Sequence, residues 1–210
     1  MEKYKVDVPE GTSGSWAIKR FEVSRSHADV FNLRAILNNE RGRYVCPGAY
    51  TKLTRNGTVI MSDTPSEIED HLGFIRHARE TGGRILVHGL GLGMCVNAVL
   101  GSPKVEHVLV IEKSPDVIAL VAPHYRDKFG DRLEIRQGDA YTWKPEKGAG
   151  WSCAWHDIWD DLCTSNLEEM TRLHRRFGRR VDWQDSWGKS LLQSRRSREK
   201  KEERRSGWWW

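Results

Sequence analysis

The sequence predicts an α/β fold built on a doubly wound, mostly parallel sheet. After Thr81-Gly82-Gly83, buried strand-like runs alternate with helical segments, and a glycine-rich turn joins the first such strand to a helix. We expect this sheet to occupy residues 84–193. An accessory region with a strand, a helix, a β-hairpin and a second helix is expected over residues 1–83, and a charged tail over residues 194–210.

The accessory region shows its elements through periodicity and turn chemistry. Residues 16–23 alternate in polarity as a strand does, and residues 27–39 read as a helix with an apolar face that includes Val30 and Leu33. Asn56-Gly57 separates two β-prone runs, and this pair tolerates the positive φ angles of a type I′ turn. The pattern therefore predicts a β-hairpin at residues 50–63.

Two helices carry start signals. Thr64 is the expected N-cap of the first, with Pro65 at the first helical position and Glu67 placed to complete a capping box. Ser114 is the expected N-cap of the second, and Pro123 is expected to end or kink that helix because it lacks an amide donor.

Five strands are expected in the parallel sheet. They fall at residues 84–88, 106–112, 132–136, 151–159 and 179–183. Only 26 residues follow Gln184, and they are mostly charged. The sheet is therefore expected to stop at five strands, which leaves a shortened C-terminal half.

The strand at residues 84–88 runs directly into Gly89-Leu90-Gly91-Leu92-Gly93, which opens a helix. Glycines let the backbone turn tightly and approach a ligand, and the helix N-terminus offers unpaired N–H groups. Such a turn can also serve packing alone. A ligand site needs further residues at the same edge of the sheet.

Two later strands supply such residues. Glu112 ends the next strand, 19 residues after Gly93, where nucleotide-binding α/β folds place a carboxylate for ribose hydroxyls. Asp139 and Ala140 follow the third strand, where a carboxylate can meet an adenine amine. The alternative interpretation of Glu112 is a solvated loop carboxylate beside Lys113. Three sites at one edge favour a ligand cleft.

The segments ILVHGLGLG, VLVIEKSPDVI, IRQGDAYTW and WSCAWHDIW resemble, in order and spacing, the motifs of class I S-adenosylmethionine-dependent methyltransferases. The resemblance covers about half of the chain and implies a Rossmann-like fold. The segment RNGTVIMSDTPSEIEDHLGFIRHA resembles the hairpin and helix that precede the glycine motif in the spermidine synthase branch. Small phage-encoded methyltransferase-like proteins also look similar.

The resemblance implies S-adenosylmethionine as cofactor. The glycines would line its methionine and ribose side, the glutamate its ribose, and the aspartate and alanine its adenine. The implied cofactor-binding residues are Gly89, Gly91, Gly93, Glu112, Asp139 and Ala140. Residues 87–92 contain no acidic side chain for the methionine ammonium, which sets this chain apart from many members of the family.

The resemblance also places Asp157 where the family keeps a catalytic or acceptor-orienting residue, and His156 is its neighbour. Methyl transfer requires the protein to align an acceptor and, where needed, to remove a proton. Asp157 is the expected base. His156 is either its catalytic partner or a core histidine, since neighbours on a strand point to opposite faces.

Three functional hypotheses follow. The first is an S-adenosylmethionine-dependent methyltransferase whose acceptor the sequence does not name. The alternatives are a spermidine synthase-like aminopropyltransferase and a non-catalytic scaffold with the cofactor fold and a basic tail. The oligomeric state stays open between monomer and homodimer.

Composition limits the setting of the protein. Four scattered cysteines without a CxxC pair or a nearby histidine predict neither a zinc site nor a disulfide framework, which favours the cytoplasm. No stretch approaches the roughly 18 apolar residues of a membrane span.

The net charge of +5 gathers in the tail, because residues 194–206 contribute seven Arg or Lys against three Glu, or +4. This run reads as an exposed charged helix or as a weak, nonspecific contact for nucleic-acid phosphates. Trp208-Trp209-Trp210 follows as a candidate exposed hydrophobic anchor.

Overall fold

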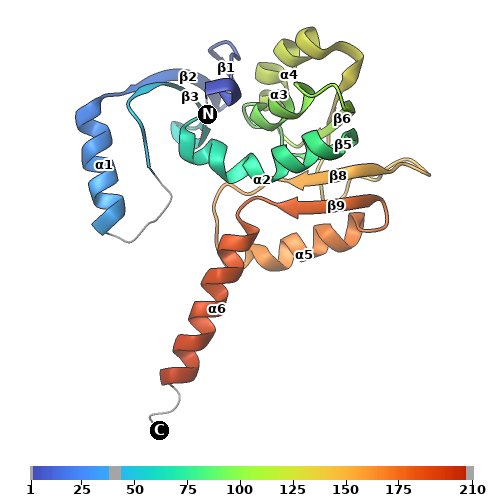
Figure 1. The fold of residues 1–210 in the computed structure, drawn as a ribbon. Helices are drawn as coiled ribbons and strands as arrows, with labels where there is room; N and C mark the ends of the chain where they lie inside the picture. The colour runs from blue at the N-terminus through green and yellow to red at the C-terminus, as the bar shows by residue number, and fades with distance from the viewer. Residues whose placement is uncertain (1, 38–43, 207–210) are drawn as a thin grey trace.

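The computed structural model describes residues 2–37 and 44–206, which form two sheets (Figure 1). One sheet has four antiparallel strands in the order β1-β2-β3-β4, and the other has five strands in the order β7-β6-β5-β8-β9. The expectation about Trp208 to Trp210 lies outside the described residues.

Every neighbouring pair in the five-stranded sheet is parallel. The central strand has its successors β6 and β7 on one side and β8 and β9 on the other, which is the doubly wound, Rossmann-like order. The predicted fold class is therefore present, and the described residues add no sixth strand to this sheet. The strands are β5 (Gly83–His88), β6 (Val105–Glu112), β7 (Leu133–Gln137), β8 (Trp151–His156) and β9 (Val181–Ser186).

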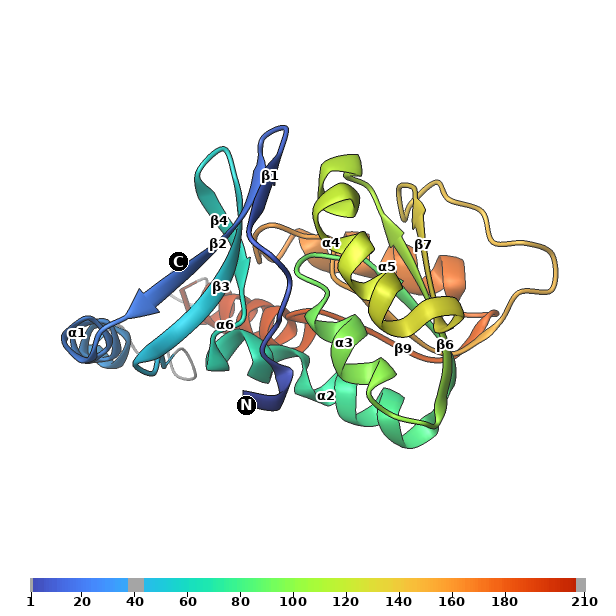
Figure 2. The ribbon, with the colours of Figure 1, turned by 90° about the horizontal axis from the view of Figure 1, so that it is seen from above.

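Helices cover both faces of the parallel sheet (Figure 1, Figure 2). Three helices, α2 (Pro65–Thr81), α3 (Met94–Leu100) and α4 (Pro115–Phe129), bury their apolar side chains on one face. On the opposite face α5 (Asn166–Phe177) packs against Leu86 and its neighbours. Alternate side chains of each central strand are therefore buried on both faces, as expected for a parallel sheet.

A loop replaces a helix in the connection from β7 to β8. Residues 138–150 contain no helix and lie beside β7 in Figure 2. Ala140, Tyr141 and Trp143 from this loop pack on the sheet face that α5 also covers. Large aromatic rings thus bury area that a crossover helix would otherwise bury.

The predicted start of α4 is confirmed, but its predicted end is wrong. Ser114 caps the helix, with its Oγ accepting a hydrogen bond of 3.3 Å from the Val117 amide. The helix continues through Pro123 to Phe129. Burial of side chains such as Tyr125 against the sheet offsets the one hydrogen bond that proline removes.

α2 begins at Pro65 as predicted, but its cap differs from the predicted capping box. Thr64 makes no side-chain cap hydrogen bond. The Glu67 carboxylate instead accepts hydrogen bonds from the amide and hydroxyl of Ser62, at 2.6 and 2.9 Å. Glu67 therefore ties the start of α2 to the end of the hairpin.

The hairpin prediction is confirmed. Asn56 and Gly57 both have positive φ, at 50° and 81°, as a type I′ turn requires. They join β3 (Gly48–Arg55) to β4 (Thr58–Ser62). The same sheet contains β2 (Trp16–Val23), which matches its prediction, and β1 (Gly11–Ser13), which the sequence did not reveal.

α1 (Arg25–Leu37) stands apart from the parallel sheet (Figure 1). Its predicted apolar face is not buried by the described residues, because Val30 and Leu33 are 51% and 57% exposed. The antiparallel sheet, by contrast, contacts the helices of the parallel sheet. The Ser13 hydroxyl of β1 donates a hydrogen bond of 2.7 Å to Asp116 at the start of α4.

α6 (Lys189–Ser206) begins near the end of β9 and extends away from the body of the molecule (Figure 1). Leu192 anchors its first turns against Leu167 and Met170 of α5. The helical interpretation of residues 194–206 is confirmed. Neither α6 nor any other helix within the described ranges has the length and apolar composition for crossing a membrane.

Gly93 provides a test of this packing. It is the N-cap of α3 with φ of 74°, and a Cβ there would overlap the ring of Tyr125. We expect Gly93→Ala to lower the free energy of unfolding by about 2–4 kcal/mol in urea denaturation, from left-handed strain and overpacking together.

Gly148→Ala is the matched control, because Gly148 has φ of 82° but open space around it. It should lose only the strain contribution, about 1–2 kcal/mol. Equal losses in the two variants would contradict the assigned role of Tyr125.

Candidate functional site

A cleft of about 1300 Å³ opens at the carboxyl ends of the parallel strands. Its walls come from the loops after all five of these strands, from β2, β3, β4 and α2, from Phe31 and Val45, and from the start of α6. The structure brings six of the sequence-predicted residues together there: Gly89, Gly91, Glu112, Asp139, Ala140 and Asp157. Gly93 and His156 do not line the cleft.

The loop after β5 lies close to the loop after β8. Gly89 has φ of 92°, and a Cβ at this position would overlap the carbonyl oxygen of Asp157. The Asp157 amide donates in turn to the carbonyl of His88 at 2.9 Å. The glycine therefore allows the backbone that carries Asp157 to approach the glycine loop.

Met61 of β4 covers the middle of the glycine loop. A Cβ at Gly91, whose φ is 51°, would overlap the Met61 sulfur, and the Leu92 amide lies 3.1 Å from that sulfur. This contact was not predicted from the sequence, because it joins positions 31 residues apart. The hairpin is thus part of the cleft wall.

Gly93 has a structural role that the sequence did not reveal. Its missing Cβ leaves room for the Tyr125 ring, whose hydroxyl donates to the Leu92 carbonyl at 3.1 Å. The buried Tyr125 fixes the end of the loop from the α4 side. Positive φ at Gly93 then starts α3.

Glu112 connects the loops after β5 and β6. Its Oε2 accepts a hydrogen bond of 2.7 Å from the Leu90 amide, and its Oε1 accepts one of 2.7 Å from the Ser114 amide. The side chain is largely buried at the cleft floor. Charge-assisted bonds to two backbone amides hold the glycine loop against the strand end.

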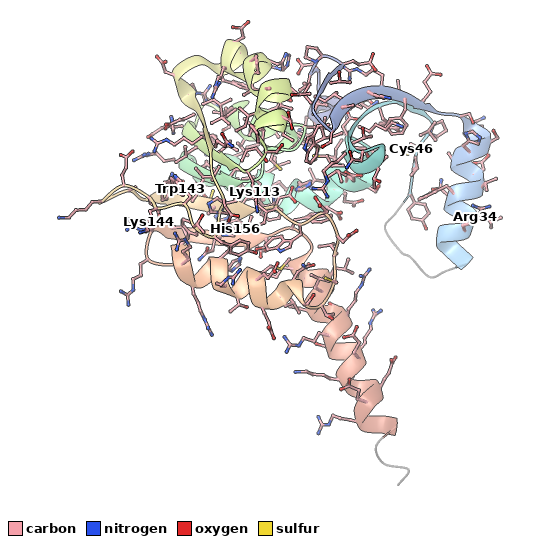
Figure 3. All side chains as sticks on the ribbon, turned by 180° about the vertical axis from the view of Figure 1, so that it is seen from behind. Arg34, Cys46, Lys113, Trp143, Lys144 and His156 are labelled. Carbon is pink, nitrogen blue, oxygen red and sulfur yellow. The ribbon has the colours of Figure 1, made fainter. Side chains whose placement is uncertain are left out.

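Asp139 lies on the next loop along the sheet edge. Its carboxylate accepts a hydrogen bond of 2.8 Å from the Tyr141 amide and pairs with Lys113 at 2.9 Å. Both partners favour the charged carboxylate and lower the pKa of Asp139, Lys113 contributing most. Lys113 is mostly exposed and is labelled in Figure 3.

Asp157 differs from Asp139 in its electrostatic surroundings. Its pKa is raised to about 7, mainly by burial and also by the negative charges of Glu67, Asp70 and Glu112. A carboxyl group whose pKa lies near neutrality can both accept and release a proton.

His71 of α2 faces Asp157 and was missed by the sequence analysis. Its Nε2 lies 3.8 Å from the Asp157 carboxylate, beyond hydrogen-bonding distance, and burial lowers its pKa to about 4. Its Nδ1 is buried without a hydrogen-bond partner. One signal was present: Glu67, Asp70 and His71 share one face of the predicted helix at spacings of three and four.

His156 belongs to a buried network away from the cleft. Its Nδ1 lies 2.7 Å from Nδ1 of His88, and its Nε2 lies 3.1 Å from Oε1 of Gln184. Gln184 donates its amide to the His174 carbonyl at 2.8 Å, so its oxygen must accept from His156. His156 is then protonated at Nε2 and accepts at Nδ1 from His88.

This network separates His156 from Asp157. The fully buried His156 ring packs beside those of His174 and Phe177 on the α5 side of the sheet (Figure 3). Asp157 instead lines the cleft. The core interpretation of His156 therefore fits its placement, and a catalytic pair with Asp157 does not.

The cleft is acidic although the chain is basic. Among the described residues its lining holds eight carboxyl groups and three cationic side chains. The acids are Glu67, Glu69, Asp70, Glu112, Asp139, Asp157, Asp160 and Asp161, and the cations are Arg55, Lys113 and Arg195. Two cations are already paired, Lys113 with Asp139 and Arg55 with Asp160 at 2.5 Å.

These carboxylates are not arranged as metal ligands. Within the described part of the chain, no group of three or more His, Cys, Asp or Glu side chains is placed to hold a metal ion. The excess of carboxyl groups over cationic side chains gives the cleft a negative potential.

The chain is similar in structure to several solved proteins, most of them described as methyltransferases. The CcbJ methyltransferase from Streptomyces caelestis is 14% identical over 54% of this chain and 44% of its own, with a TM-score of 0.43. The methyltransferase PaMTH1 from Podospora anserina, bound to SAH, is 19% identical over 51% and 45%, with a TM-score of 0.39. The [4+2]-cyclase SpnF is 22% identical over 55% and 42%, with a TM-score of 0.42.

The chain spans less than half the length of each of these three proteins. No family model and no curated protein matches its sequence. At these identities and TM-scores the comparisons assign neither substrate nor activity, so the functional argument rests on the geometry of the cleft.

The buried histidines predict a loss of stability in acid. In the folded chain the pKa values of His71, His156 and His174 are lowered to about 4, in each case mainly by burial, against about 6.5 when unfolded. The unfolded chain therefore binds more protons below pH about 6.5. Their contribution to the free energy of unfolding should be complete above that pH and fall toward pH 4, measured by urea denaturation.

His156→Gln separates this effect from that of Asp157. The raised pKa of Asp157 stabilises the fold at low pH and loses that contribution as the pH rises toward 7, which is the opposite sign. The variant removes one titrating imidazole and should show a shallower acid slope than the wild type. Identical slopes would contradict the role of His156 as a buried neutral base.

Proposed function

We propose that the protein is an S-adenosylmethionine-dependent methyltransferase, with the cofactor along the ends of β5, β6 and β7 and the acceptor beside Asp157. One observation carries the proposal. Gly89 and Gly91, Glu112, and Asp139 come from three successive strand ends and line a single cleft that Asp157 faces from a fourth. A cytoplasmic location belongs to the same proposal.

The residues present fit the ribose and adenine of this cofactor. A carboxylate offers about four acceptor sites, and Glu112 uses one on each oxygen for backbone amides. The remaining two suit the vicinal hydroxyls of a ribose. Asp139 can accept from the adenine amine, and Ile111 and Ala140 line the same stretch with apolar surface.

Two carboxylates of α2 are placed to bind the ammonium group at the methionine end of the cofactor. Residues 87–92 lack an acid, yet Glu67 and Asp70 lie close enough to Asp157 to raise its pKa, and both line the cleft. An ammonium group bound there would be stabilised by these charges. Membership of the spermidine synthase branch is part of this proposal, because the hairpin and α2 that resemble that branch form the cleft wall nearest the proposed ammonium site.

The chain's chemical task is alignment and proton removal. When bound, S-adenosylmethionine supplies a methyl group activated by its sulfonium. Asp157, at a pKa of about 7, holds its carboxylate form in useful amount near neutral pH and can take a proton from an acceptor N–H at Oδ1 or Oδ2.

The acidic lining favours a cationic amine as acceptor. Negative potential in a cleft raises the local concentration of cations and repels phosphate and carboxylate groups. Asp160 and Asp161 stand at the exposed rim beyond Asp157, where they can attract such an amine. The same carboxylates support a second candidate, aminopropyl transfer to a polyamine.

Cofactor binding gives the first test. Calorimetric titration with S-adenosylmethionine and S-adenosylhomocysteine should show micromolar binding, weakened about tenfold or more by Asp139→Asn, since about 1.4 kcal/mol corresponds to a factor of ten. Glu106→Gln, an exposed glutamate on β6, is the control and should bind as the wild type does. No binding in the wild type, or equal binding in all three, would refute the cofactor site.

Asp157→Asn tests the base. With amines of differing size as acceptors, S-adenosylhomocysteine release should rise with pH through about 7 in the wild type, and the variant should lose about 10²–10⁴-fold in kcat. Its affinity for S-adenosylmethionine should stay within a few fold of wild type. Retained kcat, or a wild-type rate independent of pH, would contradict this role.

The competing reactions separate in one assay. Decarboxylated S-adenosylmethionine with putrescine tests aminopropyl transfer, and product formation from that cofactor alone would favour the second candidate over methyl transfer. Tight cofactor binding with no turnover on either set of amines would favour the non-catalytic scaffold.

A further inference from the structure

A second concave surface is lined by α5 and α6. Figure 1 shows α6 running away from α5 at an angle. The surface is a groove of about 950 Å³ whose walls are formed by these two helices alone. Its lining residues are Leu167, Glu168, Met170, Thr171, Arg172, Arg175, Lys189, Gln193, Arg196, Ser197 and Lys200. We refer to it below as the α5–α6 groove.

The α5–α6 groove is strongly basic. Five of its lining side chains are cationic, namely Arg172, Arg175, Lys189, Arg196 and Lys200, and Glu168 is its single acid among the described residues. Lys189 pairs with Asp185 at 3.3 Å, outside the groove lining. The groove therefore has a charge opposite to that of the cleft.

Three of these cations lack an acidic partner within the described ranges. No ion pair joins Arg175, Arg196 or Lys200 to a carboxylate there, and all three are exposed. The cationic side chains of the two walls therefore face a shared space and repel one another. A bound anion would reduce this repulsion. A polyanion would therefore match the charge of this groove.

The spacing along α6 indicates an extended ligand. Lys189, Arg196 and Lys200 are separated by seven and four residues, so they share one helix face and span about 16 Å at 1.5 Å per residue. A single phosphate meets one of these positions. A chain of phosphates can meet all of them together with Arg175 on the other wall.

The shape of the groove distinguishes between polyanions. An extended single strand, with its flexible backbone and unpaired bases, can follow a narrow cationic groove such as this one. A membrane surface is matched by a flat or convex face with apolar side chains, but Leu167 and Met170 are buried at the floor of this groove. A single strand fits both the charge and the concavity.

Arg172 of the groove lining packs on an aromatic ring that lies outside the groove. The guanidinium carbon of Arg172 stands 4.3 Å from the ring centroid of Tyr141, which is partly exposed and also lines the cleft. Cationic grooves with aromatic and guanidinium planes are the common means of holding single-stranded nucleic acid. The acidic cleft beyond Tyr141 repels the phosphates and confines a strand to the groove.

We propose that the α5–α6 groove binds the sugar-phosphate backbone of single-stranded nucleic acid. The sequence placed such a contact in residues 194–206 alone, whereas the groove also requires Arg172 and Arg175 from α5 and Lys189 at the start of α6. The site is separate from the cleft. It does not depend on the proposed methyltransferase activity.

Fluorescence anisotropy of labelled single-stranded DNA and RNA of about 12 nucleotides tests the proposal at about 50 and 200 mM salt. The groove variant replaces Arg175, Arg196 and Lys200 by Gln. The control variant replaces Lys144, Arg198 and Lys201 by Gln, which are exposed, lie outside the groove lining and remove the same charge. Thermal unfolding checks that both variants stay folded.

The wild type should bind both strands, with affinity falling as salt rises. The groove variant should lose about tenfold or more in affinity, and its slope of log K against log salt should fall by about 2, at about 0.7 per phosphate contact. The control variant should lose less than about threefold in affinity.

Equal losses in the two variants would overturn the proposal, because they would show diffuse charge rather than a site. It would also be overturned by no binding of wild type at low salt, by tighter binding of duplex than of single strand, or by preferential binding to phosphatidylserine vesicles or to an acidic peptide. None of these results bears on cofactor binding, which is measured separately.

Discussion

The carboxylate of Glu112 is the contact on which the cleft depends. It accepts hydrogen bonds from the Leu90 amide in the glycine loop and from the Ser114 amide at the start of α4, both at 2.7 Å. A buried carboxylate is stable only when donors satisfy it, so the two backbone amides and the acid fix one another. This contact holds the ends of β5 and β6 together, and the absent Cβ of Gly89 then admits the Asp157 backbone from β8. The cleft is the space between these loops and the β3–β4 hairpin.

Two concave surfaces of opposite charge then share one small molecule. The cleft gathers carboxylates from α2 and from three strand ends, while the α5–α6 groove gathers cations from two helices. The overall charge of +5 conceals this separation, because it sums over both. The acidic surface raises the pKa of Asp157 and suits an amine, and the basic surface suits phosphates. Tyr141 lies at the junction, lining the cleft and stacking beneath Arg172.

Local patterns predicted much of this structure and long-range contacts supplied the rest. Strand alternation, the Asn56-Gly57 turn and the glycine loop are local, and each matches the structure. The end of α4 was misjudged because burial against the sheet outweighs the lost amide of Pro123. Which face of the sheet His156 occupies depends on register, and its network with His88 joins residues 68 positions apart. The contributions of Met61 and His71 to the cleft, and the α5–α6 groove, likewise arise from contacts that no short window contains.

The most direct test of the central claim is a backbone amide chemical-shift titration with S-adenosylhomocysteine. The cleft as described predicts the largest shifts at Leu90, Gly91, Ser114 and Ala140, with the amide of Arg196 in the α5–α6 groove unchanged. Shifts confined to the groove, or none at saturating ligand, would contradict the assignment of the strand-end cleft as the cofactor site.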